Sequence, residues 1–372
     1  MISNNALGII FANVHDNLIP ELTSKRSMAS VPFGARYRLI DFSLSNLVNA
    51  SITKVGIITR ENYQSLMDHL GSGKAWDLDR KNGGIFILPP YSINTMNVFR
   101  GHVDALVGIT KFLERSQEEY VVMCDADVVA NIDIEEMIDA HRKSGADVTV
   151  AYKTGKLPSN CEDIMVFDHD EEGWITDIKT AENSETAVDF GLDIFVLKRE
   201  LLLSFIKDAA RKNAVSLTND VFIPKLSGIK MLGYKVETFA EIIDSVLGYV
   251  NISKMLLNAS VRKELFNTER PIYTKTRDDM PTRYGIEAEV KNSLVGNGCV
   301  IEGTVKNSIL FRGVKVEKGA TVENCILMQE TVVKSNALIK NVTADKSCVI
   351  NENITLMGSD EKYIFIEKGK EI

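Results

Sequence analysis

The sequence is poor in several features that mark specialised classes of protein. Its five cysteines include no CxxC motif, and its five histidines show no spacing typical of metal ligands. These absences exclude a disulfide-stabilised secreted scaffold and a structural zinc site. No segment approaches the ~20 uncharged apolar residues of a membrane helix, and the N-terminus lacks the basic region and cleavage site of a signal peptide. We therefore expect a cytoplasmic protein that does not enter a membrane.

Basic residues are also in deficit. Lys and Arg number 43 against 51 Asp and Glu, which gives a net charge of −8 and a pI near 5.4. Nucleic-acid binding needs a basic face, so nucleic acid is not an expected partner. The remaining composition is that of a globular protein, with 45% hydrophobic and 25% charged residues, and 372 residues suffice for two domains.

The chain up to about residue 260 alternates short apolar runs with longer amphipathic ones. This pattern predicts strands at 7–12, 55–59, 85–88 and 120–125, and helices at 38–50, 63–70, 102–115 and 132–143. Continuous apolar strands joined by helices indicate an α/β fold with a Rossmann-like, doubly wound sheet. Ligands are expected beyond the carboxyl ends of its strands.

The last part of the chain repeats one phrase. The segments begin 15, 17 and 17 residues apart, and they are Val290–Val295, Val305–Leu310, Val322–Leu327 and Ile339–Ala344. This spacing is close to three stacked hexapeptides, which favours a parallel β-helix over an antiparallel sandwich with regular turns. The predicted organisation is an α/β domain over 1–260, a linker over 261–285 and a β-helix over 286–372.

Two long segments resemble a known family. Val31–Asn46 (VPFGARYRLIDFSLSN) and Pro271–Tyr284 (PIYTKTRDDMPTRY) are similar to segments of ADP-glucose pyrophosphorylases, also called glucose-1-phosphate adenylyltransferases. The resemblance implies a nucleotidyltransferase-type α/β domain followed by a left-handed parallel β-helix. It also implies chemistry in which glucose 1-phosphate attacks the α-phosphate of ATP, with Mg²⁺ held by carboxylates.

The phosphate-binding loop departs from the family's GGxGTRLxxLT pattern. Asn13, Val14 and Asp16 stand where the family has glycines that let backbone N–H groups reach the phosphates. Leu18 replaces the arginine of that loop, and Met28 replaces a lysine of the RxKP motif. A carboxylate and bulky side chains in this place oppose the binding of a triphosphate.

Other positions of the resemblance are retained in part. Candidate metal-binding and residual catalytic carboxylates are Asp125 and Asp220, and candidate substrate-binding residues are Arg100, Asp104 and Lys179. His102 stands where the family has threonine. Three of these candidates also have a purely structural interpretation: Asp125 caps a turn, Arg100 lies on the surface at a helix start, and Asp220 is a helix N-terminal acid.

These departures favour a regulatory subunit within the family. The expected partner is an active ADP-glucose pyrophosphorylase subunit in a hetero-oligomer, with a tetramer as the expected form, and no cofactor is expected for this chain alone. The alternatives are a self-sufficient sugar-nucleotide transferase with a rebuilt phosphate loop and a module that senses a phosphorylated metabolite. Such an effector would bind at the domain junction, where Lys275, Arg277 and Arg283 gather in the sequence.

Overall fold

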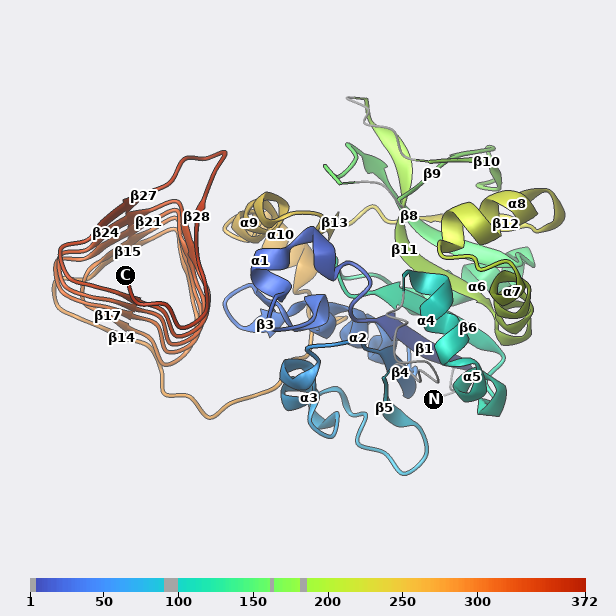
Figure 1. The fold of residues 1–372 in the computed structure, drawn as a ribbon, viewed down its shortest axis with the longest axis horizontal. Helices are drawn as coiled ribbons and strands as arrows, with labels where there is room; N and C mark the ends of the chain where they lie inside the picture. The colour runs from blue at the N-terminus through green and yellow to red at the C-terminus, as the bar shows by residue number, and fades with distance from the viewer. Residues whose placement is uncertain (1–4, 90–99, 161–163, 181–185) are drawn as a thin grey trace.

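The structure, a computed structural model, describes residues 5–89, 100–160, 164–180 and 186–372. An α/β domain and a β-helix lie side by side (Figure 1). The helix α10 ends at Leu265 and the first strand of the β-helix begins at Arg283, so the connection is shorter at both ends than the linker expected over 261–285. No helix in the described ranges is long and apolar enough to cross a membrane.

A mixed nine-stranded sheet forms the centre of the α/β domain. Its strands are β1 (Ala6–Phe11), β4 (Lys54–Ile58), β5 (Gly84–Leu88), β6 (Tyr120–Asp125), β8 (Val148–Gly155), β9 (Met165–His169), β10 (Ile175–Thr180), β11 (Val188–Lys198) and β12 (Met231–Lys235). The strands β6, β1, β4 and β5 are adjacent and parallel, as the doubly wound prediction requires. By contrast β11 runs antiparallel to β6, which apolar patterning alone could not indicate.

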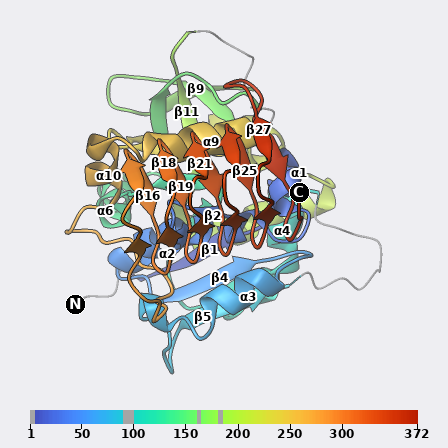
Figure 2. The ribbon, with the colours of Figure 1, turned by 90° about the vertical axis from the view of Figure 1, so that its left-hand side faces the viewer.

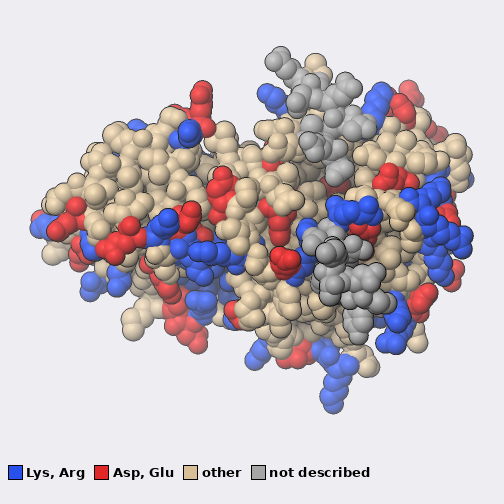
Figure 3. All heavy atoms as spheres, in the orientation of Figure 1, with Lys and Arg blue, Asp and Glu red and all other residues tan. Residues whose placement is uncertain are grey.

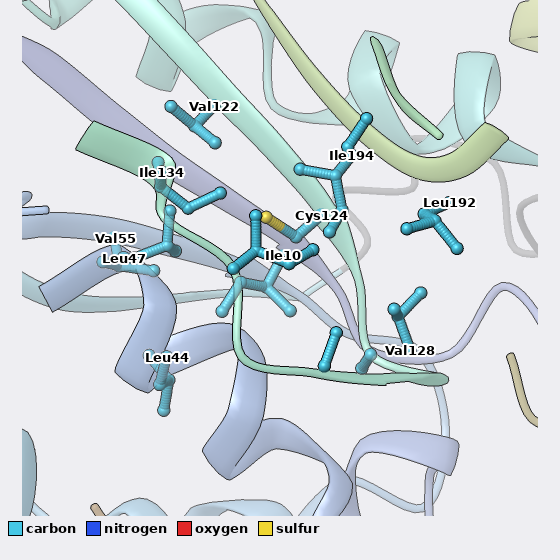
Figure 4. Packing of buried hydrophobic residues seen from close by; sticks show 14 of the residues in the cluster. Ile10, Leu44, Leu47, Val55, Val122, Cys124, Val128, Ile134, Leu192 and Ile194 are labelled. Carbon is cyan, nitrogen blue, oxygen red and sulfur yellow. The ribbon is translucent and has the colours of Figure 1, made fainter. Parts of the chain in front are cut away.

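Some helices of the α/β domain cover both faces of this sheet, and others pack between it and the β-helix. The helices are α1 (Pro20–Thr23), α2 (Leu39–Asn49), α3 (Gln64–Leu70), α4 (His102–Gly108), α5 (Thr110–Arg115), α6 (Ile134–Ser144), α7 (Arg199–Arg211), α8 (Ile223–Lys225), α9 (Val246–Met255) and α10 (Ala259–Leu265). The helix predicted over 102–115 is divided in two at Ile109. Alternate residues of β1 enter separate cores, with Ile10 on the side of α2 and α6 (Figure 4) and Ile9 on the side of α4 and α7.

Three parallel five-stranded sheets wind around the β-helix, and Figure 2 shows its stacked coils. The first sheet contains β14 (Arg283–Tyr284), β17 (Val300–Ile301), β20 (Lys315–Val316), β23 (Val332–Val333) and β26 (Val349–Ile350). The second contains β15 (Glu289–Lys291), β18 (Thr304–Lys306), β21 (Thr321–Glu323), β24 (Leu338–Lys340) and β27 (Thr355–Met357). The third contains β16 (Leu294–Val295), β19 (Ile309–Leu310), β22 (Ile326–Leu327), β25 (Val342–Ala344) and β28 (Ile364–Ile366).

The repeated phrase sets the register of these coils. Val290 pairs with Val305, Val305 with Val322, and Val322 with Ile339, and the last three side chains are fully buried. The asparagine two residues after each of these positions has a positive φ of 47–54°, which asparagine tolerates better than most residues. Each repeat therefore supplies one side chain to a column that faces the interior and one asparagine to a corner of the coil. The predicted equivalence of the repeats is confirmed.

The two domains share buried contacts. One apolar cluster combines Met28 and Phe33 of the α/β domain with Phe311 and Met328 of the β-helix. Short antiparallel pairs lie on the α/β side: β2 (Pro32–Phe33) with β3 (Tyr37–Arg38), and β7 (Val128–Ala130) with β13 (Ala240–Ile242). The domains are thus joined by a common core as well as by the linker.

Candidate functional site

The carboxyl ends of β1 and β6 bring three side chains together. The two strands are parallel neighbours, with Phe11 opposite Asp125. Asp125 is the last residue of β6, His15 lies on the loop after β1, and His102 is the first residue of α4. This position, beyond the strand ends in the middle of the sheet, is where ligands bind in α/β folds.

Both histidines contact the same carboxylate oxygen. The Nε2 atoms of His15 and His102 each lie 2.7 Å from Oδ2 of Asp125, and Nδ1 of His15 lies 3.9 Å from Oδ2 of Asp127. The two aspartates are almost fully buried, whereas the side chains of His15 and His102 are 17% and 12% exposed. The negative charge of Asp125 is therefore paired within the chain.

Charge coupling in this cluster is strong. Burial opposes protonation of the histidines, but the carboxylates Asp127 and Asp125 raise the pKa of His15 to about 10, and Asp125 raises the pKa of His102. Burial also opposes ionisation of Asp125, yet the two histidines lower its pKa. Burial and the charge of Asp125 raise the pKa of Asp193 to about 7. The interaction of Asp125 with the two histidines thus opposes the effect of burial at all three residues.

The loop after β1 uses its polar groups on itself. Asp16 accepts hydrogen bonds from the backbone N–H of Met28 and from the Asn13 side chain, both at 2.7 Å. The side-chain oxygen of Asn13 accepts the backbone N–H of Arg60 at 3.0 Å. Burial raises the pKa of Asp16 to about 6. The N–H groups of Met28, Arg60 and Asn13, which could otherwise bind an anion, therefore already donate to oxygens of this loop.

A second feature is a cationic cavity of about 230 Å³ between the two domains. Its lining residues are Arg36, Arg38, Asp68, His69, Lys275, Arg277, Arg312, Gln329, Glu330, Lys346, Ser347 and Lys368, seven of them Lys or Arg. Figure 3 shows basic side chains gathered at the junction of the domains. We call this feature the junction pocket.

Positive charges crowd one another in the junction pocket. Burial and the nearby Arg38 and Arg26 guanidinium groups lower the pKa of Lys346 to about 7. Burial, with repulsion from Arg26 and Arg277 acting in the same direction, lowers the pKa of Arg38 to about 10. An anion in the pocket would relieve this repulsion, so the pocket has the electrostatics of an anion-binding site.

Comparison with known proteins places the chain in a family. The family models for nucleotidyl transferase and for the GlmU-like C-terminal hexapeptide match residues 17–187 and 279–363. The glycogen biosynthesis protein GlgD of Bacillus subtilis is 36% identical, over 99% of this chain and 97% of its own length. The chain belongs to the GlgD and glucose-1-phosphate adenylyltransferase family.

Other relatives carry both names of this family. The GlgD protein of Geobacillus stearothermophilus is 35% identical over 86% of this chain and 83% of its own length. The glucose-1-phosphate adenylyltransferase of the same organism is 33% identical over 85% of this chain and 83% of its own length. The comparisons confirm the predicted architecture, a nucleotidyltransferase-type α/β domain followed by a left-handed β-helix.

The Mg²⁺ that the family's chemistry implies does not fit these residues. Mg²⁺ takes oxygen ligands in near-octahedral geometry, but here two imidazoles contact Asp125. Asp220 lies in the π-helical turn η4 (Thr218–Phe222), where its Oδ2 accepts the backbone N–H groups of Val215 and Ser216 at 2.7 and 2.9 Å. In the described part of the chain, the group able to hold a metal consists of His15, His102 and Asp125, without Asp220.

The predicted substrate-binding residues pair with close neighbours. Arg100 and Asp104 form a bidentate ion pair at 2.8 and 3.1 Å at the start of α4, and Arg100 is exposed. Lys179 on β10 contacts Asp168 and lies 3.8 Å from Asp177, again on the surface. Their roles in binding a substrate remain predictions.

The predicted effector residues are brought together only in part. Lys275 and Arg277 line the junction pocket, and Lys275 donates to the backbone oxygen of Asp68. Arg283 is not among the lining residues; it lies 3.8 Å from Glu302 on the surface of the β-helix. The other basic residues of the pocket, Arg36, Arg38, Arg312, Lys346 and Lys368, come from segments far apart in the sequence. The sequence analysis did not identify them.

Sequence reasoning also missed the partnership of the two histidines. His102 is recognisable as a departure from the family threonine, and Asp125 as a residue at a strand end. The connection of His15 to them depends on how the loop after β1 folds back over the sheet, and no local pattern reveals this.

Proposed function

We propose that this chain is a non-catalytic, regulatory subunit of a glucose-1-phosphate adenylyltransferase complex in glycogen biosynthesis. The proposed complex is a cytoplasmic hetero-oligomer, expected to be a tetramer, that also contains an active subunit. The observation that carries the proposal is the pairing of His15 and His102 with Asp125 at the position where the family's chemistry needs a free carboxylate.

Nucleotidyl transfer depends on cations arranged around a triphosphate and on a metal held by carboxylates. Here Asp125 is paired with two histidines within the chain, and the loop carries Asp16 where the family has a glycine. Removing one charge-stabilising donor from such a site costs roughly 10²–10³ in rate. Since the loop lacks an arginine and the following motif a lysine, we expect negligible turnover by this chain alone.

The names of the relatives support the choice of partner. Similarity over 85–99% of this chain to GlgD proteins and to a glucose-1-phosphate adenylyltransferase supports a shared scaffold. A subunit that retains the scaffold and lacks the phosphate loop can still pack against an active homologue. We infer that such packing modifies the partner's rate or its response to an effector.

The junction pocket is the proposed effector site. Its seven cationic side chains converge from both domains, so a phosphorylated metabolite bound there would contact the α/β domain and the β-helix together. Such a ligand would favour one relative placement of the domains. A coupling of ~1–3 kcal/mol, or about 5- to 150-fold in affinity, suffices for regulation.

The decisive experiment measures ADP-glucose formation from ATP, glucose 1-phosphate and Mg²⁺. The purified chain, an active glucose-1-phosphate adenylyltransferase, and their mixture are assayed in parallel, with size-exclusion chromatography and light scattering of the mixture. We expect no turnover by the chain alone, a mixed oligomer, and altered kinetics of the partner. Turnover by the chain alone would establish the self-sufficient transferase instead.

Variants separate the pocket from the rest of the surface. Lys275→Met and Arg277→Met should weaken the effector response of the mixed complex by at least about 10-fold, since each removes a charge that faces the ligand. Arg283→Met removes a surface cation outside the pocket and should leave the response unchanged. If the chain neither joins the partner nor changes its kinetics but still binds phosphorylated metabolites, the metabolite-sensing module is the correct account.

A further inference from the structure

We propose that His15, His102 and Asp125 form a binding site for a divalent transition metal ion, with Zn²⁺ as the best-fitting ion. This inference goes beyond the regulatory role and does not depend on it. It follows from the disagreement between the oxygen-only preference of Mg²⁺ and the nitrogen donors at this position.

The donor atoms are already assembled. One ligand atom from each of the three residues lies within 4.8 Å of the other two. Zn²⁺ binds imidazole nitrogen and carboxylate oxygen at ~2.0–2.2 Å, so tetrahedral donors stand ~3.3 Å apart. The two Nε2···Oδ2 distances are 2.7 Å, so an ion requires each histidine to withdraw from Asp125 by roughly 0.6 Å. His15 lies on a loop and can provide part of this movement.

Two buried oxygens supply an independent indication. In the described part of the chain, Oδ1 of Asp125 and Oδ1 of Asp127 have no hydrogen-bond partner, although both side chains are about 98–99% buried. Buried carboxylate oxygens are normally paired, because leaving them unpaired costs folding free energy. A metal ion held by both oxygens of Asp125 would satisfy Oδ1 of that residue, and Asp127, which lies 3.9 Å from Nδ1 of His15, is positioned to orient the His15 ring.

The chemistry of the donors selects the ion. Two imidazoles and a carboxylate suit Zn²⁺, Co²⁺ and Ni²⁺, whereas Mg²⁺ requires oxygen ligands and several waters. The partial exposure of both histidines leaves a path for the ion from the carboxyl end of the sheet. A bound ion would join the loop after β1, the start of α4 and the end of β6. We therefore expect it to stabilise the fold in this region.

The test uses the full chain carrying no polyhistidine tag, stripped of metal and then dialysed against Zn²⁺. Elemental analysis should show one Zn²⁺ per chain, and Zn²⁺ should raise the thermal unfolding midpoint, because a ligand that binds only the folded state stabilises it. Co²⁺ in place of Zn²⁺ should give the visible absorption of a four-coordinate ion. Excess Mg²⁺ should neither displace the ion nor reproduce these effects.

Variants locate the ion. His15→Ala and His102→Thr should each weaken Zn²⁺ binding by at least 10- to 100-fold and abolish the Co²⁺ spectrum, with folding checked by circular dichroism. The matched control is His169→Ala, which removes another histidine paired with an aspartate, Asp189, at 3.1 Å on a different part of the sheet. This control should bind Zn²⁺ like the unmodified chain.

Two results would overturn the proposal. If the unmodified chain binds no Zn²⁺ or Co²⁺, the cluster is an internal ion pair and nothing more. If His15→Ala and His102→Thr bind Zn²⁺ as tightly as the unmodified chain, the metal lies elsewhere. Neither result bears on catalysis or partner binding, so failure here is distinguishable from failure of the proposed function.

Discussion

A buried ion pair between the two domains provides the sharpest test of how the chain is held together. Arg26 follows α1, and Asp345 follows β25 in the β-helix. The Nη2 atom of Arg26 lies 2.8 and 2.7 Å from the two carboxylate oxygens of Asp345, and the residues are only 2% and 3% exposed. Nη1 of Arg26 also approaches the sulfur of Met328 at 3.9 Å. The pair thus crosses the interface where solvent hardly reaches it.

The expected cost follows from this burial. Arg26→Met leaves the carboxylate of Asp345 buried without its counter-charge, which should lower the free energy of unfolding by ~3–5 kcal/mol. The double variant Arg26→Met with Asp345→Leu leaves no unpaired charge and should recover most of that loss. Lys306→Met serves as the control, because it breaks an exposed pair with Glu289 at 3.2 Å and should cost at most about 1 kcal/mol.

Equilibrium unfolding in guanidinium chloride measures these differences. Tryptophan fluorescence follows the α/β domain, which contains Trp76 and Trp174, and far-UV circular dichroism follows the whole chain. In the single variant we also expect the two signals to separate, since the domains lose a shared contact. A loss below 1 kcal/mol for Arg26→Met, or a double variant as unstable as the single one, would refute the reasoning.

Three further predictions concern packing and pH. Gly303→Ala should destabilise the β-helix by ~1–3 kcal/mol, because a Cβ atom at this position would lie 2.4 Å from the backbone oxygen of Ala320. The control Gly228→Ala has open space around the added Cβ and should not destabilise the chain. Thermal unfolding compares the two variants. Burial raises the pKa of Asp16 from 3.8 to about 6, so the folded chain retains a proton that the unfolded chain loses between these pH values. Stability should therefore fall by up to about 3 kcal/mol as the pH rises from 4 to 7, and Asp16→Asn should lose this pH dependence in denaturant titrations. The pKa of Lys346 is lowered to about 7, and an anion in the junction pocket would favour the protonated form of this side chain. The affinity for the anion, measured by calorimetry, should therefore fall as the pH rises above 7. Lys346→Met should lose this pH dependence.

Much of the fold was predictable because its determinants are local or periodic. The strand predicted over 120–125 has those bounds in the structure, and the repeated phrase determined the register of Val305 against Val322. The segment Val31–Asn46 supports strand ends elsewhere: Ser43 donates to the backbone oxygen of Asp125 at 3.0 Å, and Asn46 contacts Ala130 and Ile132. Its similarity to the family therefore carried real information about the sheet.

The candidate site was less predictable because it depends on contacts between distant segments. Asp125 was identifiable from its place at a strand end. The effect of His15 and His102 on it was not, since neither histidine has a partner nearby in the sequence. The junction pocket shows the same limit: Lys275 and Arg277 were expected to act together, but Arg36, Lys346 and Lys368 reach them only through the packing of the two domains.

The departures from the family pattern have partners inside the chain. His102 contacts Asp125, Asp16 takes the backbone N–H of Met28, and Met28 itself is 1% exposed in the apolar cluster shared with the β-helix. Restoring the family lysine at Met28 would place an ammonium group among Phe311 and Met328, at a large desolvation cost. The substitutions are therefore integrated into the packing of both domains, and single reversions should lose stability before they regain any affinity for phosphate.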